Sequence, residues 1–290
     1  MTAPSTVPQV GPELTVYEMT NEEAYRAVKW ALDAGYRHID TAEWYENEHA
    51  CGRAISDWLE DHPLTTREEI FYTTKLKTNV SRLDTVDKIK KSLKTSTLSY
   101  IDLYLLHSPI GGKRVREECW KGCMDAKEYG WVKSIGVSNY GVAHIQEFID
   151  ARAATAAESG NGAIRKPELP VLSQIDLHPF MRRPAIVDIC EKNDILLEQV
   201  TRPGFTQMEY PTRTSATSLA PLSSFTESYA EATQSDLIHQ KFIAIPKSVS
   251  QARIEANAQI FDFELDEEDM KQLDALDEYL VTDWDVVDEP

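Results

Sequence analysis

The chain has 290 residues, of which 42% are hydrophobic and 27% charged, and its formal net charge is -18 at pH 7. This composition is typical of a globular protein, and the length fits one domain over residues 1–290, since a single α/β barrel usually takes about 250 residues. Because a strongly negative field repels polyanions, we expect neither nucleic acid nor an acidic membrane as a partner. No apolar stretch approaches the roughly 20 residues of a membrane-spanning helix.

The four cysteines indicate a reducing compartment. They form no Cys-x-x-Cys pair, and no apolar secretory segment precedes them. We therefore expect free thiols in a cytoplasmic protein. Cys119 and Cys123 lie four residues apart on a predicted helix, but no histidine partners them, so we expect no metal site there. The sequence leaves the oligomeric state open, and we expect a monomer.

Strand-like and helical patterns alternate along most of the chain. Residues 1–12 are rich in proline, and we expect them to be loosely held. Strands are predicted at 13–18, 36–40, 70–75, 101–106, 132–137, 171–175, 195–197 and 242–245, and helices at 21–34, 46–61, 81–97, 114–129, 141–153, 183–193 and 250–259. Seven or eight such units without a Gly-x-Gly-x-x-Gly turn favour a parallel (β/α)8 TIM-type barrel over a doubly wound sheet. An extra C-terminal helix at 266–276 and an acidic tail follow.

Polar side chains stand where the predicted strands end. Because the carboxyl ends of the strands meet at one face of a barrel, we expect these side chains to gather there. In chain order they are Asp40, Lys75, His107, Ser138, Asn139, Gln174, Lys247 and Ser248, with Tyr45 five residues after Asp40.

Four of these residues form a set suited to proton transfer. A phenol is a weak acid with a pKa near 10, and an adjacent ammonium stabilises its phenolate form. We expect Lys75 to play that part for Tyr45, Asp40 to hold Lys75 in place, and His107 to orient the oxygen of a substrate. Such a set can protonate a carbonyl oxygen but carries no hydride, so a nicotinamide cofactor is required.

The residues around this set resemble a known family. The stretches GYRHIDTAEWYENE, FYTTKLK, DLYLLHSP, SIGVSNYG, LSQIDLHPF and IPKSVSQARIEAN are similar, in order and spacing, to those of the aldo-keto reductases. The likeness runs from about Thr20 to Leu197 and resumes at Phe242. It implies a (β/α)8 barrel that reduces small aldehydes or ketones with NADPH, with Tyr45 as the general acid.

The resemblance also implies a cofactor site. Ser138, Asn139 and Gln174 would hold the nicotinamide carboxamide. A second group, Lys247, Ser248, Arg253 and Asn257, matches the family's clamp on the adenosine 2′-phosphate and adenine. Two cations within seven residues are a sensible phosphate site in an otherwise acidic protein, which favours NADPH over NADH.

Three segments depart from the family pattern. The usual Gly-aromatic-Gly-Thr strand near the N-terminus is replaced here by Val10-Gly11-Pro12-Glu13-Leu14-Thr15, and the clamp has Ala256 where the family has Glu. Residues 199–240 are rich in Ser and Thr and lack an apolar period, and Val200 stands where an aromatic usually stacks on the nicotinamide. We expect this segment to be either a disordered or rebuilt cofactor loop or the product of a shifted frame or mis-splicing.

Two other functions fit parts of this sequence. His38 and Asp40 form a His-x-Asp pair at a strand end, as in metal-dependent hydrolase barrels, but no second His pair accompanies them and Tyr45 and Lys75 would have no role, so no metal is expected. A barrel that keeps these residues yet binds cofactor poorly, and acts as a binding or scaffold protein, is the alternative.

Trp44 is expected to line the substrate pocket, and Trp284 lies either at the pocket mouth or in a frayed tail.

Overall fold

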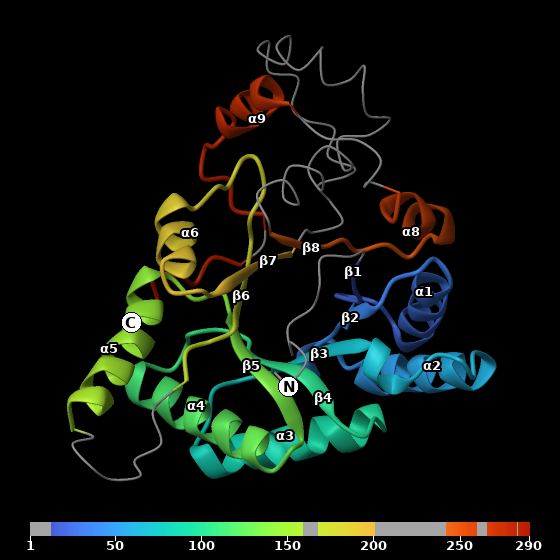
Figure 1. Cartoon of the computed structure of the whole chain (residues 1–290), viewed down its shortest axis with the longest axis horizontal. Coiled ribbons are helices and arrows are strands. Elements are labelled where there is room, and N and C mark those ends of the chain that lie inside the picture. The colour runs from blue at the N-terminus through green and yellow to red at the C-terminus, as the bar shows by residue number, and fades with distance from the viewer. Residues whose placement is uncertain (1–12, 159–167, 201–241, 260–265, 283) are drawn as a thin grey trace.

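A computed structural model describes residues 13–158, 168–200, 242–259, 266–282 and 284–290 (Figure 1). Strand β1 pairs with β2, and each later strand pairs in parallel with the next, in the unbroken order β1 to β8. The strands are β1 (Glu13–Thr15), β2 (His38–Asp40), β3 (Phe71–Leu76), β4 (Ile101–Leu106), β5 (Val132–Ser138), β6 (Leu172–Ile175), β7 (Leu196–Val200) and β8 (Ile243–Ile245). This order is that of the predicted barrel.

The two edge strands of the sheet approach each other, so the barrel is nearly closed. The backbone amide of Thr15, at the end of β1, donates a hydrogen bond of 3.2 Å to the carbonyl of Pro246, directly after β8. We call this contact the seam. Strand β1 has three residues, whereas the sequence pattern extended to residue 18. It pairs with His38–Asp40 of β2 in spite of its departure from the family pattern.

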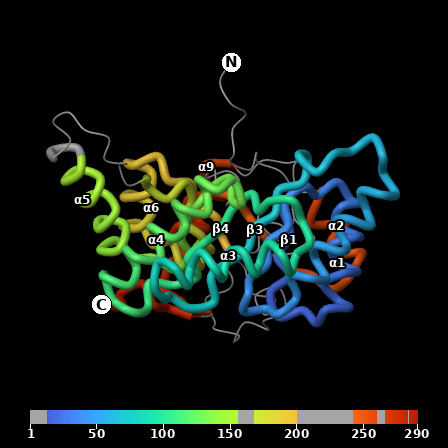
Figure 2. The backbone as a smooth tube through the Cα atoms, turned by 90° about the horizontal axis from the view of Figure 1, so that it is seen from below, coloured from blue at the N-terminus to red at the C-terminus, as the bar shows by residue number. Residues whose placement is uncertain are grey.

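The described helices α1 to α6 lie outside the strands, and neighbouring helices such as α3 and α4 run side by side (Figures 1 and 2). Their starts follow local signals. Thr20 and Glu23 form a capping box at the first helix, and Ser81 caps the third through the amide of Asp84. None of the described helices combines the length and apolar character needed to cross a bilayer. The helices are α1 (Asn21–Asp33), α2 (Glu48–Asp61), α3 (Arg82–Ser96), α4 (Lys113–Glu128), α5 (Val142–Glu158), α6 (Pro184–Glu191), α8 (Gln251–Asn257) and α9 (Glu267–Asp274), with 3-10 turns η1 (Glu43–Tyr45) and η2 (Arg67–Glu69).

Strand β7 corrects one predicted boundary. The strand was expected to end at residue 197, before the atypical segment that begins at 199. Instead it continues through Gln199 and Val200, because they pair with Ala244 and Ile245 of β8. Residues 201–241, most of the atypical segment, and residues 1–12 lie outside the described residues, as does the side chain of Val200.

Among the residues that the structure describes, two apolar clusters form the core. The larger one lies between the helices and the outward faces of the strands and contains residues such as Ile39, Tyr104 and Ile135. The smaller one consists of Leu103, Leu105, Leu172, Ile243 and Ile245, from β4, β6 and β8. All four cysteines are free and buried, as expected.

Candidate active site

Lys75 is the centre of the site. Strand β3 carries its side chain into the barrel, where it is fully buried. The ammonium donates hydrogen bonds to Asp40 Oδ1 at 2.7 Å, to the Thr41 carbonyl at 3.0 Å and to Tyr45 Oη at 3.2 Å. A buried cation is stable only with such partners, because it has lost its hydration. One ammonium is therefore shared between a carboxylate and a phenol.

Asp40 is held by three side chains. Besides Lys75, its carboxylate accepts hydrogen bonds from Thr15 Oγ1 at 2.9 Å and from Gln174 Nε2 at 3.0 Å. These donors come from β1 and β6, so the carboxylate joins three separate strands to its own, β2. Its position is fixed before any ligand arrives.

Tyr45 lies in the turn η1, which follows β2. The rings of Tyr17 and His107 contact its ring edge to face, with centroids 5.0 and 5.8 Å away. Asn47 anchors the turn by donating to the carbonyls of Val16 and Met19 at 3.0 and 3.1 Å. Packing and backbone anchoring thus aim the phenol at Lys75.

His107 directly follows β4 and is half-buried at the same place. Shielding from water and the nearby Lys75 cation hold the pKa of its imidazole well below the usual 6.5. The ring is therefore neutral at physiological pH and has one N–H to donate. We refer to Asp40, Tyr45, Lys75 and His107 as the tetrad, and the structure brings all four together as the sequence predicts.

The tetrad opens into a cavity of about 350 Å³. Trp44 and Trp284 stand beside His107, with ring centroids 6.3 and 6.4 Å from the imidazole. Trp284 therefore lies at the pocket mouth, and its alternative placement in a frayed tail is wrong. The cavity is lined by Tyr17, Trp44, Tyr45, His107, Ser138, Asn139, Gln174, Asp176, Thr282 and Trp284.

Three lining residues were not anticipated from the sequence. Tyr17 follows β1, the strand whose pattern is atypical. Asp176 follows β6 and accepts hydrogen bonds from the amide and hydroxyl of Thr282 at 3.3 and 2.9 Å. The signal for Asp176 was its place two residues after Gln174, whereas Thr282 is recruited by the return of the tail to the barrel mouth.

Ser138, Asn139 and Gln174 lie side by side in the cavity, on β5, just after β5, and on β6. Asn139 donates to the His107 carbonyl at 3.1 Å, and its φ of 61° lies in the left-handed region that Asn tolerates better than most residues. Gln174 Nε2 donates to a carboxylate oxygen of Asp40 at 3.0 Å and to Oε1 of Glu198. Its carbonyl oxygen is thus left to accept from a ligand amide.

The clamp residues lie apart from the cavity lining, at the end of β8 and on α8. Arg253 Nε donates to Ser248 Oγ at 3.3 Å, and Asn257 ends α8. Lys247 Nζ lies 3.9 Å from a carboxylate oxygen of Glu18 and 5.7 Å from the centre of the Tyr17 ring. Since Tyr17 also lines the cavity, it connects Lys247 of the clamp with the cavity that contains Tyr45 and His107. Two cations, a hydroxyl and an amide are donors that suit a nucleotide phosphate.

Comparison with known proteins agrees with this geometry. The model of the Aldo/keto reductase family matches residues 12–200. An uncharacterized oxidoreductase of Schizosaccharomyces pombe is 37% identical over 275 residues, covering 92% of this chain and 90% of the relative. A methylglyoxal reductase of Escherichia coli is 32% identical over 282 residues, and the alignment covers 94% of this chain and 90% of the relative.

Solved structures agree as well. The aldo-keto reductase of Bombyx mori, in complex with NADP, superposes with a TM-score of 0.79 at 31% identity, covering 93% of this chain and 90% of that chain. An aldo-keto reductase from a deep-sea metagenome library gives a TM-score of 0.78 at 33% identity, with 95% and 94% covered. The chain belongs to the aldo/keto reductase family.

Proposed function

We propose that this protein reduces a small aldehyde or ketone to the alcohol with NADPH, and that Tyr45 is the general acid. The observation that carries the proposal is the position of the Lys75 ammonium, 2.7 Å from Asp40 and 3.2 Å from the Tyr45 hydroxyl. A cation so close to the phenol stabilises the phenolate that remains after the proton has left.

The proton side of the reaction follows from the tetrad. The Tyr45 hydroxyl gives its proton to the carbonyl oxygen, and Lys75 offsets the negative charge left on the phenol. His107, which is neutral, donates its N–H to the same carbonyl oxygen and orients it toward Tyr45. A bound nicotinamide supplies the hydride for the carbonyl carbon.

The cofactor contacts are proposed on the same grounds. Gln174 accepts from the carboxamide nitrogen, while Ser138 and Asn139 bind the carboxamide beside it. The clamp, Lys247, Ser248, Arg253 and Asn257, binds the adenosine 2′-phosphate and adenine. A relative solved with NADP supports a nicotinamide cofactor in the family, and the two cations of the clamp favour the phosphorylated form.

The substitution Tyr45→Phe tests the proposal. NADPH oxidation is followed with a nitrobenzaldehyde, and cofactor binding by quenching of tryptophan fluorescence. Loss of the general acid should lower kcat by a factor on the order of 10² to 10⁴ and leave quenching intact. The control is Tyr25→Phe, which removes a hydroxyl bonded to Asp57 on the outside of the barrel.

Two outcomes contradict the proposal. If the wild type binds NADPH but turns over no aldehyde or ketone, the barrel is a binding or scaffold protein, the alternative considered from the sequence. If Tyr45→Phe keeps the wild-type kcat, another group supplies the proton.

A further inference from the structure

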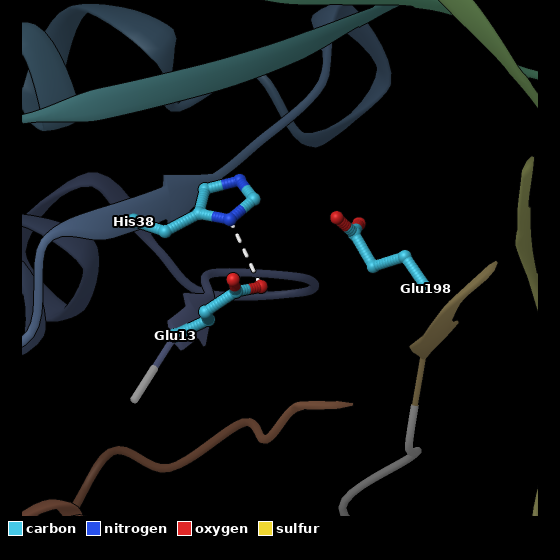
Figure 3. Close-up of side chains that lie close together, drawn as sticks. All are labelled: Glu13, His38 and Glu198. Atoms are coloured by element: carbon cyan, nitrogen blue, oxygen red, sulfur yellow. Dashed lines mark ion pairs between the residues drawn. The ribbon is translucent and has the colours of Figure 1, made fainter. Parts of the chain in front are cut away.

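Three ionisable side chains meet inside the barrel, apart from the tetrad. Glu13, His38 and Glu198 come from β1, β2 and β7 and point toward one another (Figure 3). Each offers a ligand atom, and these atoms lie within 4.8 Å of one another. The exposed fractions are 1%, 3% and 0%, so the cluster is closed to solvent. His38 precedes Asp40 by two residues on β2, which places the cluster deeper in the barrel than the tetrad.

The carboxylates of this cluster have few hydrogen-bond donors in the part of the chain that the structure describes. Within the described residues, neither Glu13 oxygen has a hydrogen-bond partner, and its one polar contact is the ion pair of 2.9 Å with His38 Nδ1. Glu198 accepts from Gln174 through one oxygen, and its second oxygen is unpaired among those residues. Native proteins rarely leave several buried polar atoms in one place unpaired, and an ion accounts for such a group.

The imidazole of His38 is already oriented as a metal ligand. Its Nε2 lies 2.8 Å from Thr73 Oγ1, so the ring can donate Nε2–H to that hydroxyl and keep a lone pair on Nδ1, which faces Glu13. Histidines that bind metals almost always give their other N–H to an oxygen in this way.

Charge and surroundings favour a divalent cation. Two carboxylates and a neutral imidazole carry a charge of about −2, which a divalent ion balances. A separate apolar cluster consists of Leu103, Leu105, Leu172, Ile243 and Ile245, and Ile243 of this cluster is the sheet partner of Glu198. Two like charges in such a medium repel each other strongly unless a cation lies between them.

We propose that Glu13, His38 and Glu198 bind a divalent transition-metal ion, with Zn²⁺ as the fitting probe. Zinc bonds to nitrogen and carboxylate oxygen are about 2.0–2.2 Å long, which puts neighbouring ligands of a tetrahedral site about 3.3 Å apart. A carboxylate oxygen of Glu13 and Nδ1 of His38 are near that separation, at 2.9 Å, and an oxygen of Glu198 lies within 4.8 Å of both ligand atoms. The second oxygen of either carboxylate fills the fourth position.

The site differs from the hydrolase-type metal site considered from the sequence. That site paired His38 with Asp40, but Asp40 is bonded to Lys75, Thr15 and Gln174. With no open position and no access from the cavity, the ion is structural. It joins β7 to β1 and β2 across the barrel, and so reinforces the sheet next to the seam.

The alternative occupant is a proton. Although burial opposes the charged imidazole, Glu13 and Glu198 together raise the pKa of His38 to about 9. The cluster can therefore hold a charged His38 and a protonated carboxyl instead of an ion, and only metal analysis separates the two states.

Metal content is the test. Protein expressed in zinc-supplemented medium is dialysed against EDTA, and zinc per chain is measured by plasma mass spectrometry. A closed structural site should retain about one equivalent. Glu13→Gln and Glu198→Gln should each retain less than about a tenth of that, since each removes a charged ligand. The matched control is Glu48→Gln, a buried carboxyl that accepts from Thr74 at 2.7 Å outside the cluster, and it should keep the metal.

Cobalt gives a second readout that needs no variant. Wild-type protein refolded with one equivalent of Co²⁺ should show the intense visible bands of a tetrahedral ion with nitrogen and oxygen ligands, and a higher Tm than the metal-free protein. Wild type that retains no zinc and shows no cobalt bands overturns the proposal, whether or not the variants fold. Zinc retained equally by folded Glu13→Gln and Glu198→Gln also overturns it, because the metal then lies elsewhere.

Discussion

Gln174 Nε2 lies 3.0 Å from Asp40 Oδ2, and the same nitrogen donates to Glu198. One amide therefore links the tetrad to the buried cluster below it. This arrangement also fixes the orientation of the amide, because its NH₂ group must face the two oxygens to which it donates. A side chain that the family resemblance assigns to the cofactor thus has a structural task as well.

Replacing Gln174 with Leu should affect stability and cofactor binding together. Two buried carboxylates would each lose a hydrogen bond, for a loss of about 2–4 kcal/mol in the free energy of unfolding, measured by urea denaturation. Gln146→Leu, which removes a bond to Asp150 on an exposed helix face, should stay within about 0.5 kcal/mol of wild type. An equal decrease in the free energy of unfolding for the two variants would show that the Gln174 hydrogen bonds stabilise the fold no more than an exposed one does.

Removing either half of the Asp40–Lys75 pair should have unequal effects. Asp40→Asn leaves a fully buried ammonium without its anion, at a cost of about 3–5 kcal/mol. Lys75→Met should cost less, because Thr15 and Gln174 still donate to Asp40. Both variants should lose turnover. Thermal and urea unfolding measure how far each variant is destabilised, and a larger decrease in the free energy of unfolding for Lys75→Met than for Asp40→Asn would contradict this account.

Trp284→Ala should raise KM more than it lowers kcat. The indole walls the cavity beside Trp44 and His107, but it lies outside the tetrad. Losing an aromatic contact of about 1–2 kcal/mol corresponds to a rise in KM for an aromatic aldehyde of roughly 5- to 30-fold. The control is Tyr129→Ala, an exposed ring at the end of α4 that contacts Trp131 in a tilted arrangement and is not part of the cavity lining. A fall in kcat at unchanged KM would place Trp284 in the chemical step.

Arg253→Ala should weaken binding of NADPH and not of NADH. Its guanidinium bonds to Ser248 in the proposed 2′-phosphate site, and only NADPH carries that phosphate. Loss of a charge-assisted contact of about 1.5–3 kcal/mol predicts a roughly 10- to 150-fold higher Kd for NADPH. Fluorescence titration with both nucleotides provides the internal control. A parallel loss for NADH would show that the residue supports the fold of α8 instead.

His178 should make the protein less stable in acid. Burial, followed by the nearby Arg183 and Arg182 cations, lowers its pKa from 6.5 to about 4. At a pH between 4 and 6.5 the imidazole is protonated in the unfolded chain but neutral in the folded chain. The free energy of unfolding therefore falls as the pH drops from 6.5 toward 4. This contribution reaches up to about 3 kcal/mol at pH 4. When the free energy of unfolding is measured with urea from pH 7 to 4, it should therefore decrease less for His178→Gln than for the wild type. The same decrease in both proteins would contradict this role of His178.

The sequence predicted the barrel and the tetrad because both depend on local patterns. The strands end in polar residues, and the carboxyl ends of parallel strands meet, so the proximity of Asp40 and Lys75 follows from order along the chain. Thr282 could not be placed in this way, since it reaches the cavity only when the tail folds back. The cluster of Glu13, His38 and Glu198 was missed because it joins strands one, two and seven, whose inward faces meet only after closure.

The same closure explains why the first strand was hard to assign. Glu13 stands in a segment that departs from the family's Gly-aromatic-Gly-Thr pattern, so only the short run at residues 13–18 predicts a strand there. The structure forms β1 through its pairing with β2 and through the burial of Glu13 against His38. The strand is specified by its partners more than by its own residues.

The seam joins two short segments, of which one leads to Tyr17 in the cavity lining and the other to Lys247 of the proposed nucleotide site. Tyr17 follows Thr15 by two residues, and Lys247 comes directly after Pro246, the two residues that share the seam hydrogen bond. A dinucleotide that reaches from Lys247 into the cavity beside Tyr17 would contact both edges of the sheet. Bound NADPH would then hold the two edges together, so the hydrogen-exchange rate of the Thr15 amide should fall when the cofactor binds.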